Sequence, residues 1–234
     1  YISSHDLQEP LRKIQTFGGR LSDKFAGKLG EEGRDYLERM NRAATRMRGL
    51  IEDLLTYSRV TTKGRPFSPV RIGPIIREAV SNLNSRIEET GGSVDAAEIS
   101  TRIEADPTQM LQLFQNLIGN ALKFHRRDKP PVIRIHGQPV PALRTPPSGR
   151  AHPTKSYRFV VEDNGIGFDE KYLDRIFEPF QRLHGRFEYE GTGMGLAICR
   201  KIVDRHGGEI TATSKPGEGS AFIITLPLKQ DKNR

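Results

Sequence analysis

NLIGNALKF, residues 116–124, combines an apolar helical face with a second stripe of polar side chains. Asn116, Asn120 and Lys123 follow one another at spacings of four and three, so they share one stripe beside the apolar face. The carbonyl oxygen of an asparagine is a hard ligand that suits Mg²⁺. The segment therefore predicts a helix with a candidate Mg²⁺ site, although a solvated helix edge would show the same pattern. The residues of the apolar face are Leu113, Phe114, Leu117, Ile118, Ala121 and Leu122.

The next candidate is DNGIGF, residues 163–168, which follows the strand-like run RFVVE. Glycines at alternate positions, Gly165 and Gly167, let the backbone turn sharply and approach a flat ligand. A buried carboxylate at Asp163 would accept a hydrogen bond from the amine of adenine and repel the carbonyl oxygen of guanine, favouring ATP over GTP. Taken alone, the same residues are also typical of any turn that ends a strand.

A third segment, GTGMGLAICRKIV at 191–203, is a glycine-rich loop that runs into an apolar-periodic helix. Gly191, Gly193 and Gly195 free backbone N–H groups to point at phosphate oxygens, and the helix N-terminus adds a partial positive charge. The loop matches neither the Rossmann nor the Walker spacing. By itself this triplet is a weak indication of phosphate binding.

The first third of the chain predicts two long helices. Apolar residues at spacings of three and four run through 4–25 and again through 37–58, and the glycine-rich segment AGKLGEEG lies between them. We expect an antiparallel helical hairpin, which leaves two apolar stripes to be covered. Pairing with a second copy in a four-helix bundle would cover them, and packing on the rest of the same chain is the alternative. His5 lies off the stripe, so we expect its imidazole to face solvent.

Beyond the hairpin, helical and extended segments alternate, which predicts a two-layer α/β sandwich with helices on one face of the sheet. Residues 137–156 are expected to form a surface loop. The predicted domains are a hairpin over 1–62, a linker over 63–70, an α/β domain over 71–230 and a tail over 231–234. The helical patterns cover 73–89, 107–125 and 194–205, and the strand patterns cover 132–137, 157–164, 208–214 and 220–228.

Composition excludes several classes of protein. The net charge of +8 is diffuse, with 12 Lys and Arg against 9 Asp and Glu in residues 1–64, so no nucleic-acid-binding stripe is indicated. A single cysteine excludes an internal disulfide, and six scattered histidines do not form a zinc motif. No run of apolar residues is long enough for a membrane span.

The order of these segments is more specific than any one of them, and it resembles the sensor histidine kinases of two-component signalling. The segments HDLQEPLR and FQRLHGRFEYEGTGMGLA are most similar in sequence to the bacterial phytochrome-like and multi-sensor branch. The matching segments are SHDLQEPL (4–11) for the phospho-acceptor box, NLIGNALKF (116–124) for the asparagine box, DNGIGF (163–168) and GTGMGLA (191–197) for the glycine boxes, and FEPF (177–180) for the phenylalanine box.

The resemblance implies a dimeric phosphotransfer hairpin followed by an ATP-binding domain of the Bergerat (GHKL) fold. It implies that ATP phosphorylates His5, that Asp6 orients the imidazole and takes its proton, and that the phosphoryl group then passes to an aspartate of a response regulator receiver domain. An upstream sensor domain is implied as a further partner. The resemblance places the kinase region in the cytoplasm and leaves open whether the full-length protein is soluble or membrane-anchored.

The same resemblance assigns roles to residues of the α/β domain. Asp163 would bind the adenine amine with support from Ser220, Arg182 would stabilise the transferred group, and Phe177 and Phe180 would pack a lid over 181–192. The remaining assignments are Asn116 and Asn120 for Mg²⁺, Lys123 for the phosphates, Phe124 for the nucleotide face, Gly165 and Gly167 for the adenine pocket, and Gly191, Thr192, Gly193 and Gly195 for the phosphate loop.

Glu9 and Pro10 of the phospho-acceptor box lead to two further predictions, one about phosphatase activity and one about the geometry of the helix. Many relatives carry Thr or Asn where this chain has Glu9, and a carboxylate there would repel a phosphorylated aspartate, so weak or absent phosphatase activity is expected. Pro10 removes one helical hydrogen bond, which we expect to loosen the turn beside His5.

Two residues outside the boxes are interpreted structurally. We expect Cys199 to be a small core residue and His206 to be a favourable partner of a helix dipole. Two other functions stay open at this point, a non-catalytic nucleotide-binding scaffold and a gyrase-type ATPase.

Overall fold

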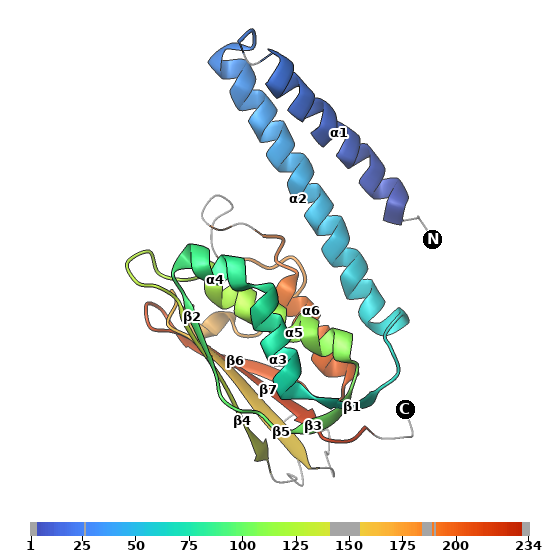
Figure 1. Ribbon diagram of the computed structural model, residues 1–234, viewed down its shortest axis with the longest axis vertical. Helices are drawn as coiled ribbons and strands as arrows, with labels where there is room; N and C mark the ends of the chain where they lie inside the picture. The colour runs from blue at the N-terminus through green and yellow to red at the C-terminus, as the bar shows by residue number, and fades with distance from the viewer. Residues whose placement is uncertain (1–3, 26, 141–154, 184–188, 190, 231–234) are drawn as a thin grey trace.

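The computed structural model describes residues 4–25, 27–140, 155–183, 189 and 191–230, and for residues 4–7 it describes the backbone alone. A long helical hairpin stands on an α/β domain, and the lower half of its second helix runs beside that domain (Figure 1). Both predicted parts of the fold are confirmed. Within the described residues, every helix is too short or too polar to cross a membrane.

The hairpin consists of α1 (Ser4–Phe25) and α2 (Gly30–Thr62). The two helices approach closely at Gly18, where an added Cβ would lie 2.3 Å from Oδ1 of Asn41. Leu11 and Ala44 are buried between the helices, but most of the apolar stripe is exposed in a single chain. An uncovered apolar surface of this kind is what the expected dimer requires. The large exposed apolar side chains of the stripe are Ile14, Leu21, Phe25, Met40, Met47 and Leu54, and Phe17 and Tyr36 are exposed beside it.

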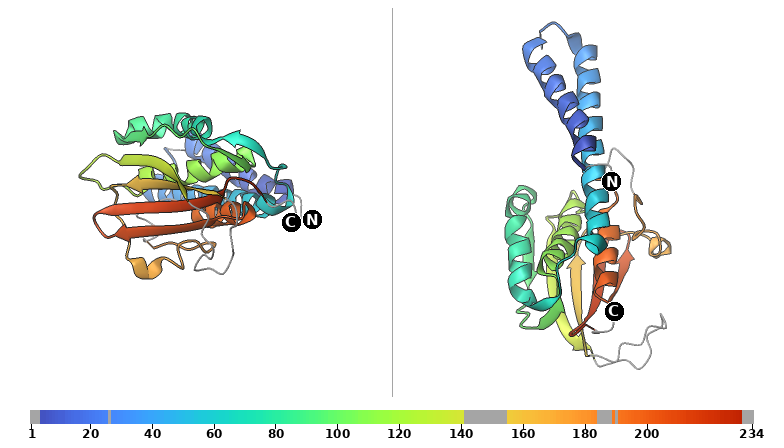
Figure 2. Two further views of the ribbon diagram at one scale, coloured as in Figure 1. Left: turned by 90° about the horizontal axis from the view of Figure 1, so that it is seen from below. Right: turned by 90° about the vertical axis from the view of Figure 1, so that its right-hand side faces the viewer.

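The α/β domain contains a five-stranded sheet in the order β2-β4-β5-β7-β6. Helices α3, α5 and α6 cover one face of this sheet, as predicted (Figures 1 and 2). The pair β2–β4 is parallel, and the other neighbours are antiparallel. The elements are β1 (Ser68–Arg71), α3 (Ile72–Asn82), α4 (Asn84–Thr90), β2 (Ser93–Ala96), β3 (Arg102–Ala105), α5 (Pro107–Lys123), β4 (Val132–Val140), β5 (Ser156–Asp163), η1 (Glu170–Tyr172), α6 (Gly195–Arg205), β6 (Glu209–Lys215) and β7 (Gly219–Pro227).

Several predicted boundaries differ from the structure. Strand β1 begins within the predicted linker 63–70 and pairs with β3 in a separate two-stranded sheet. The helix predicted over 73–89 is divided at Leu83 into α3 and α4. Strand β4 extends to Val140, into the predicted loop 137–156, because residues 137–140 pair with β5. The remainder of that loop, 141–154, lies outside the described residues.

The end of α2 is joined to the α/β domain by a buried polar network around Asp106. The Asp106 carboxylate accepts hydrogen bonds from the backbone N of Arg65 at 2.7 Å and from Nη1 of Arg205 at 3.1 Å. Arg205 also donates to the carbonyl of Arg65 at 2.7 Å, and Gln109 donates to the carbonyl of Val60 at 2.8 Å. Asp106 is 1% exposed. The segment between the two domains is therefore held at the ends of α5 and α6.

His206 extends this network and corrects one expectation. Its Nδ1 donates to the carbonyl of Ile202 at 2.7 Å, and its Nε2 accepts from the backbone N of Asp106 at 3.0 Å. Burial lowers the pKa of His206 to about 4, so the ring is neutral near pH 7. His206 thus lies at the helix end as predicted, but it acts there as an uncharged hydrogen-bond donor and makes no charge–dipole interaction.

The prediction for Cys199 is confirmed, because its side chain is fully buried in the core of the α/β domain. Burial also raises the pKa of its thiol to about 12.

Candidate functional site

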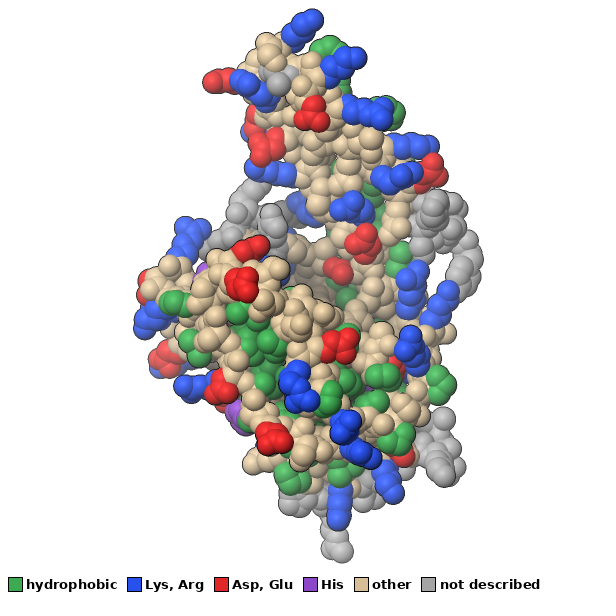
Figure 3. Space-filling model, in the orientation of Figure 1, with side chains coloured by type: hydrophobic (Ala, Val, Ile, Leu, Met, Phe, Trp, Pro, Cys, Tyr) green, Lys and Arg blue, Asp and Glu red, His purple; other side chains and the backbone are tan. Residues whose placement is uncertain are grey.

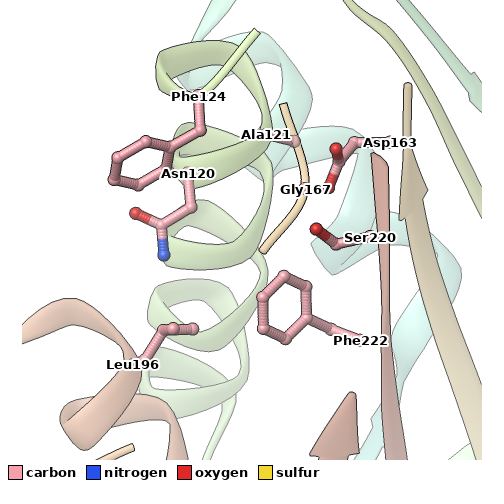
Figure 4. A pocket seen from close by; sticks show the side chains of 8 residues that line it. All are labelled: Asn120, Ala121, Phe124, Asp163, Gly167, Leu196, Ser220 and Phe222. Carbon is pink, nitrogen blue, oxygen red and sulfur yellow. The ribbon is translucent and has the colours of Figure 1, made fainter. Parts of the chain in front are cut away.

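A small pocket lies between helix α5 and strands β5 and β7 (Figure 4). The side chains of Asp163 and Ser220 enter it from the sheet, while Asn120 and Phe124 project from α5 on the opposite side. Five residues predicted for the site thus meet in one place, although they come from three separate segments of the chain. The lining residues are Asn120, Ala121, Phe124, Asp163, Gly167, Leu196, Ser220 and Phe222.

Asp163 is the charged group at the back of this pocket. It ends β5, and its Oδ1 accepts a hydrogen bond from the backbone N of Gly165 at 2.8 Å. Burial raises the pKa of Asp163 to about 6, while hydrogen bonds from the backbone of Gly165 and Ser220 act in the opposite direction. The side chain is therefore mainly a carboxylate at pH 7, a strong acceptor facing an apolar wall.

The turn after Asp163 depends on close backbone contact. Gly167 has φ +62°, and a Cβ there would lie 2.1 Å from the carbonyl oxygen of Lys215. The backbone N of Phe168 donates to Oγ of Ser214 at 2.8 Å, and that hydroxyl lies 3.1 Å from Oγ of Ser220. Ser220 therefore supports Asp163 through its backbone, while its hydroxyl belongs to a serine pair that holds the turn.

Helix α5 presents its polar stripe at the mouth of the pocket. Nδ2 of Asn116 donates to the carbonyl of Gly195 at 3.3 Å, which leaves the amide oxygen of Asn116 as its other polar group. The ammonium of Lys123 lies 4.2 Å from the centroid of the Phe124 ring. The Phe124 ring in turn packs against Tyr189, with centroids 5.1 Å apart.

The glycine-rich loop closes the site next to this stripe. A Cβ at Gly191 would lie 2.7 Å from Nζ of Lys123, so the ammonium sits against the loop. Nη1 of Arg182 donates to the carbonyl of Gly191 at 2.8 Å, and its Nη2 donates to the carbonyl of Tyr189. Thr192 donates from its hydroxyl to the carboxylate of Asp53 in α2. Two predicted residues, Arg182 and Thr192, thus contact protein groups in this conformation.

The phospho-acceptor box lies in the hairpin, and none of its described side chains, those of residues 8–11, lines the pocket. His5 and Asp6 are in the first turns of α1, and their side chains lie outside the described residues, as does the predicted solvent exposure of His5. Glu9 forms an exposed ion pair with Lys13 at 2.8 Å. Pro10 is accommodated within α1.

The phenylalanine box is divided between core and surface. Phe177 is buried and packs against Phe222, with ring centroids 6.4 Å apart, whereas Phe180 is exposed and has φ +63°. Of the lid predicted over 181–192, residues 184–188 and 190 lie outside the described part of the chain. Neither phenylalanine lines the pocket, and only Phe177 is packed in the core.

Sequence reasoning missed four contributors to the site. Ala121, Leu196 and Phe222 supply apolar walls, and Ser214 holds the turn. Ala121 follows Asn120, and Leu196 follows Gly195, so their adjacency to predicted site residues was an available signal. Phe222 carries no such signal, because its place depends on the pairing of β7 with β5.

Taken together, the pocket suits a planar base with an exocyclic amine that is joined to an anionic group. The carboxylate of Asp163 would accept from the amine, while Leu196, Phe124 and Phe222 would contact the ring faces. The ammonium of Lys123 and the loop at 191–195 offer positive potential at the mouth. A purine nucleotide with several phosphates has this combination of groups.

Comparison with known families agrees with this chemistry. Residues 105–230 match the family described as histidine kinase-, DNA gyrase B- and HSP90-like ATPases, and residues 2–63 match the His Kinase A phospho-acceptor domain. The chain belongs to the sensor histidine kinases. Its α/β part is therefore the ATP-binding catalytic domain of this family, and its hairpin is the phospho-acceptor domain.

Individual relatives support the assignment over nearly the whole chain. The phytochrome-like protein Cph1 of Synechocystis sp. is 40% identical over 97% of this chain, which corresponds to 28% of that protein. The crystal structure of full-length ShkA in complex with AMPPNP has a similar fold, with a TM-score of 0.67 and 24% identity over 97% of this chain and 45% of that chain. The kinase ThkA in complex with the response regulator protein TrrA gives a TM-score of 0.64 and 23% identity, over 97% of this chain and 60% of that one.

The shifted pKa values of Asp163 and His206 have opposite effects on how the stability of the fold depends on pH. For His206 the pKa is about 4 when folded and 6.5 ordinarily, so its contribution is present above pH 6.5 and is lost as the pH falls toward 4. For Asp163 the pKa is about 6 when folded and 3.8 ordinarily, so folding gains stability from it as the pH falls through 6. Asp163→Asn removes the second effect, and we expect this variant to lose stability more steeply than the wild type between pH 6.5 and 4.5.

Urea unfolding midpoints at several pH values measure this difference. Glu162→Gln, the neighbouring residue on β5, is the matched control and should keep the wild-type slope. Equal slopes in the wild type and Asp163→Asn would contradict the raised pKa.

Proposed function

We propose that this chain is a kinase region that uses ATP to phosphorylate His5 and then passes the phosphoryl group to an aspartate of a receiver domain. The observation that carries the proposal is the carboxylate of Asp163 in an apolar pocket beside a lysine and a glycine loop, in one chain with a histidine-bearing hairpin. The pocket accounts for adenine recognition, and the hairpin supplies the acceptor.

In the first step a ring nitrogen of His5 attacks the γ-phosphorus of ATP. A nitrogen–phosphorus bond forms, the bond from that phosphorus to the β,γ-bridging oxygen breaks, and ADP leaves with the electron pair. Asp6 orients the neutral imidazole and takes the proton of its other ring nitrogen. Lys123 and the N–H groups at 191–195 would neutralise phosphate charge, since phosphoryl transfer requires mainly positioning and electrostatic stabilisation.

The amide side chains of α5 fit a bound Mg²⁺. Asn116 donates its N–H to the carbonyl of Gly195, so its amide oxygen is the group that could bind a cation, and Asn120 lines the pocket. Mg²⁺ is usually bound by a few protein oxygens together with the phosphates of the substrate, so phosphate oxygens would complete its ligands here. When bound, Mg²⁺ would supply charge neutralisation at the phosphates.

We propose two protein partners and no nucleic acid, since Lys and Arg side chains are scattered among Asp and Glu on the face shown in Figure 3. A second copy of the chain would cover the exposed apolar stripe of α1 and α2 in a four-helix bundle. A response regulator receiver domain would accept the phosphoryl group, in line with the ThkA–TrrA complex. An upstream sensor domain is the third expected component, because the matched region is 28% of the length of the phytochrome-like relative.

Incubation with γ-labelled ATP and Mg²⁺ tests the proposal. We expect a label on the protein that is acid-labile and base-stable, that is absent from His5→Gln and that persists in His136→Gln, a change on the exposed face of β4. Free phosphate without labelled protein would instead indicate a hydrolytic ATPase. The absence of both labelled protein and free phosphate would indicate a nucleotide-binding scaffold. Each of these two results would overturn the proposed kinase activity.

A further inference from the structure

The glycine loop is attached to helix α2 by one side chain. The hydroxyl of Thr192 donates to Oδ2 of Asp53, a residue 139 positions away in the chain. The same hydroxyl oxygen accepts a hydrogen bond from the backbone N of Met194 at 3.3 Å. Thr192 lies between two glycines of the loop that the proposed function assigns to the phosphates of ATP, so Asp53 places a carboxylate at that loop.

The position of Asp53 follows from the packing of α2 on the catalytic domain. A Cβ at Gly49 would lie 3.6 Å from the methyl group of Thr192, the ammonium of Lys201 lies 4.8 Å from the centroid of the Tyr57 ring, and Val60 is buried in the core. Residues 49, 53, 57 and 60 are spaced by four, four and three, so they form one face of α2. Helix α2 lies beside α6 over its lower part (Figures 1 and 2).

The carboxylate of Asp53 and a phosphate of ATP would both accept a hydrogen bond from the hydroxyl of Thr192. A hydroxyl has a single proton and donates it to one acceptor at a time. An anion at Asp53 also repels an incoming phosphate through the loop that would bind it. Asp53 and the phosphates therefore compete both for a hydrogen bond and for the positive potential near Lys123 and the start of α6.

We propose that Asp53 is a built-in competitor of ATP, which lowers nucleotide affinity while α2 is docked against the glycine loop. This inference rests on the proposed function, because it assumes that the loop binds phosphates. Docking of α2 and binding of ATP then oppose each other by the same factor in both directions. Any movement of α2 that withdraws Asp53 from Thr192 would raise the affinity for ATP, which gives the hairpin a means of regulating the catalytic domain.

The test measures the dissociation constant of a fluorescent ribose-labelled ATP analogue with Mg²⁺. We expect Asp53→Ala to bind it about 3- to 10-fold more tightly than the wild type, a moderate factor because solvent screens a half-buried contact. Asp53→Asn, which removes the charge and keeps an acceptor, should fall between the two. Glu52→Gln removes a charge from the adjacent, exposed position of α2 and should keep the wild-type affinity.

Two further readings separate the possible outcomes. The gain in affinity should shrink as the salt concentration rises, since screening weakens the repulsion. Unchanged or weaker binding by Asp53→Ala, in a wild type that binds the analogue and labels His5, would overturn this inference alone. Failure of the wild type and of every variant to bind the analogue would overturn both this inference and the proposed function.

Discussion

Asp163→Asn is expected to weaken ATP binding about 100-fold, because in the proposed binding mode it replaces a charged acceptor of the adenine amine by a neutral amide. A charge-assisted hydrogen bond contributes about 1.5–3 kcal/mol. Labelling of His5 at low ATP concentration should fall in parallel. The amide also has its own N–H donors, which would face the amine of adenine. Titration with the fluorescent ATP analogue and the labelling assay measure the two effects.

Folding of this variant should not suffer at neutral pH. The raised pKa of Asp163 means that the buried carboxylate costs stability at pH 7, so its neutral replacement should unfold at an equal or higher urea concentration. Loss of binding can therefore be separated from loss of fold. Glu162→Gln is the control on the same strand, and its binding should match the wild type.

The choice between purines gives a second readout at the same site. A carboxylate repels the carbonyl oxygen of guanine, so the wild type should prefer ATP strongly over GTP. Asp163→Asn should narrow this preference. If the variant bound ATP within threefold of the wild type and kept the preference, Asp163 would have no role in base recognition.

Asp106→Asn is expected to destabilise the protein by about 3 kcal/mol, because it leaves the half-buried guanidinium of Arg205 without its counter-charge. Asparagine is itself a good residue at a helix N-cap, so the cap of α5 should persist and the loss should report on the charge. For a domain of this size the melting temperature should fall by about 10 °C. Differential scanning calorimetry measures this shift.

A second variant distinguishes lost charge pairing from general damage. Arg205→Met in the Asp106→Asn background removes the unpaired cation and should recover part of the lost stability. Asp128→Asn breaks an exposed pair with Arg126 and should leave the melting temperature unchanged. An Asp106→Asn protein as stable as the wild type would show that the buried pair contributes nothing to the joint between the two domains.

Local patterns predicted the elements that carry strong periodicity. Helices α1, α5 and α6 begin and end close to the predicted residues, because their apolar faces repeat at helical spacing over three or more turns. The short strands β1, β2 and β3 were missed, since four residues give too few repeats to show a period. Their pairing partners lie far away in the chain, so no local signal was available.

The charge state of His206 shows a different limit. Its position near the end of a helix suggested a favourable partner of the helix dipole, but its burial against Asp106, 100 residues away, decides that the ring is neutral. The joint at Asp106 and Arg205 and the contact of Thr192 with Asp53 are of the same kind. Each depends on groups from distant segments that meet only after folding.

The sequence alone determined the two-part architecture, the family resemblance and five of the residues that line the pocket, because helical periodicity and the order of motifs can be recognised from consecutive residues. Tertiary structure alone decided how these parts act on one another. Protonation, burial and competition for a hydrogen bond depend on which side chains become neighbours in space. In the sequence, Asp53 is an ordinary charged residue of a helix. Its proposed competition with ATP arises only because α2 packs against the glycine loop.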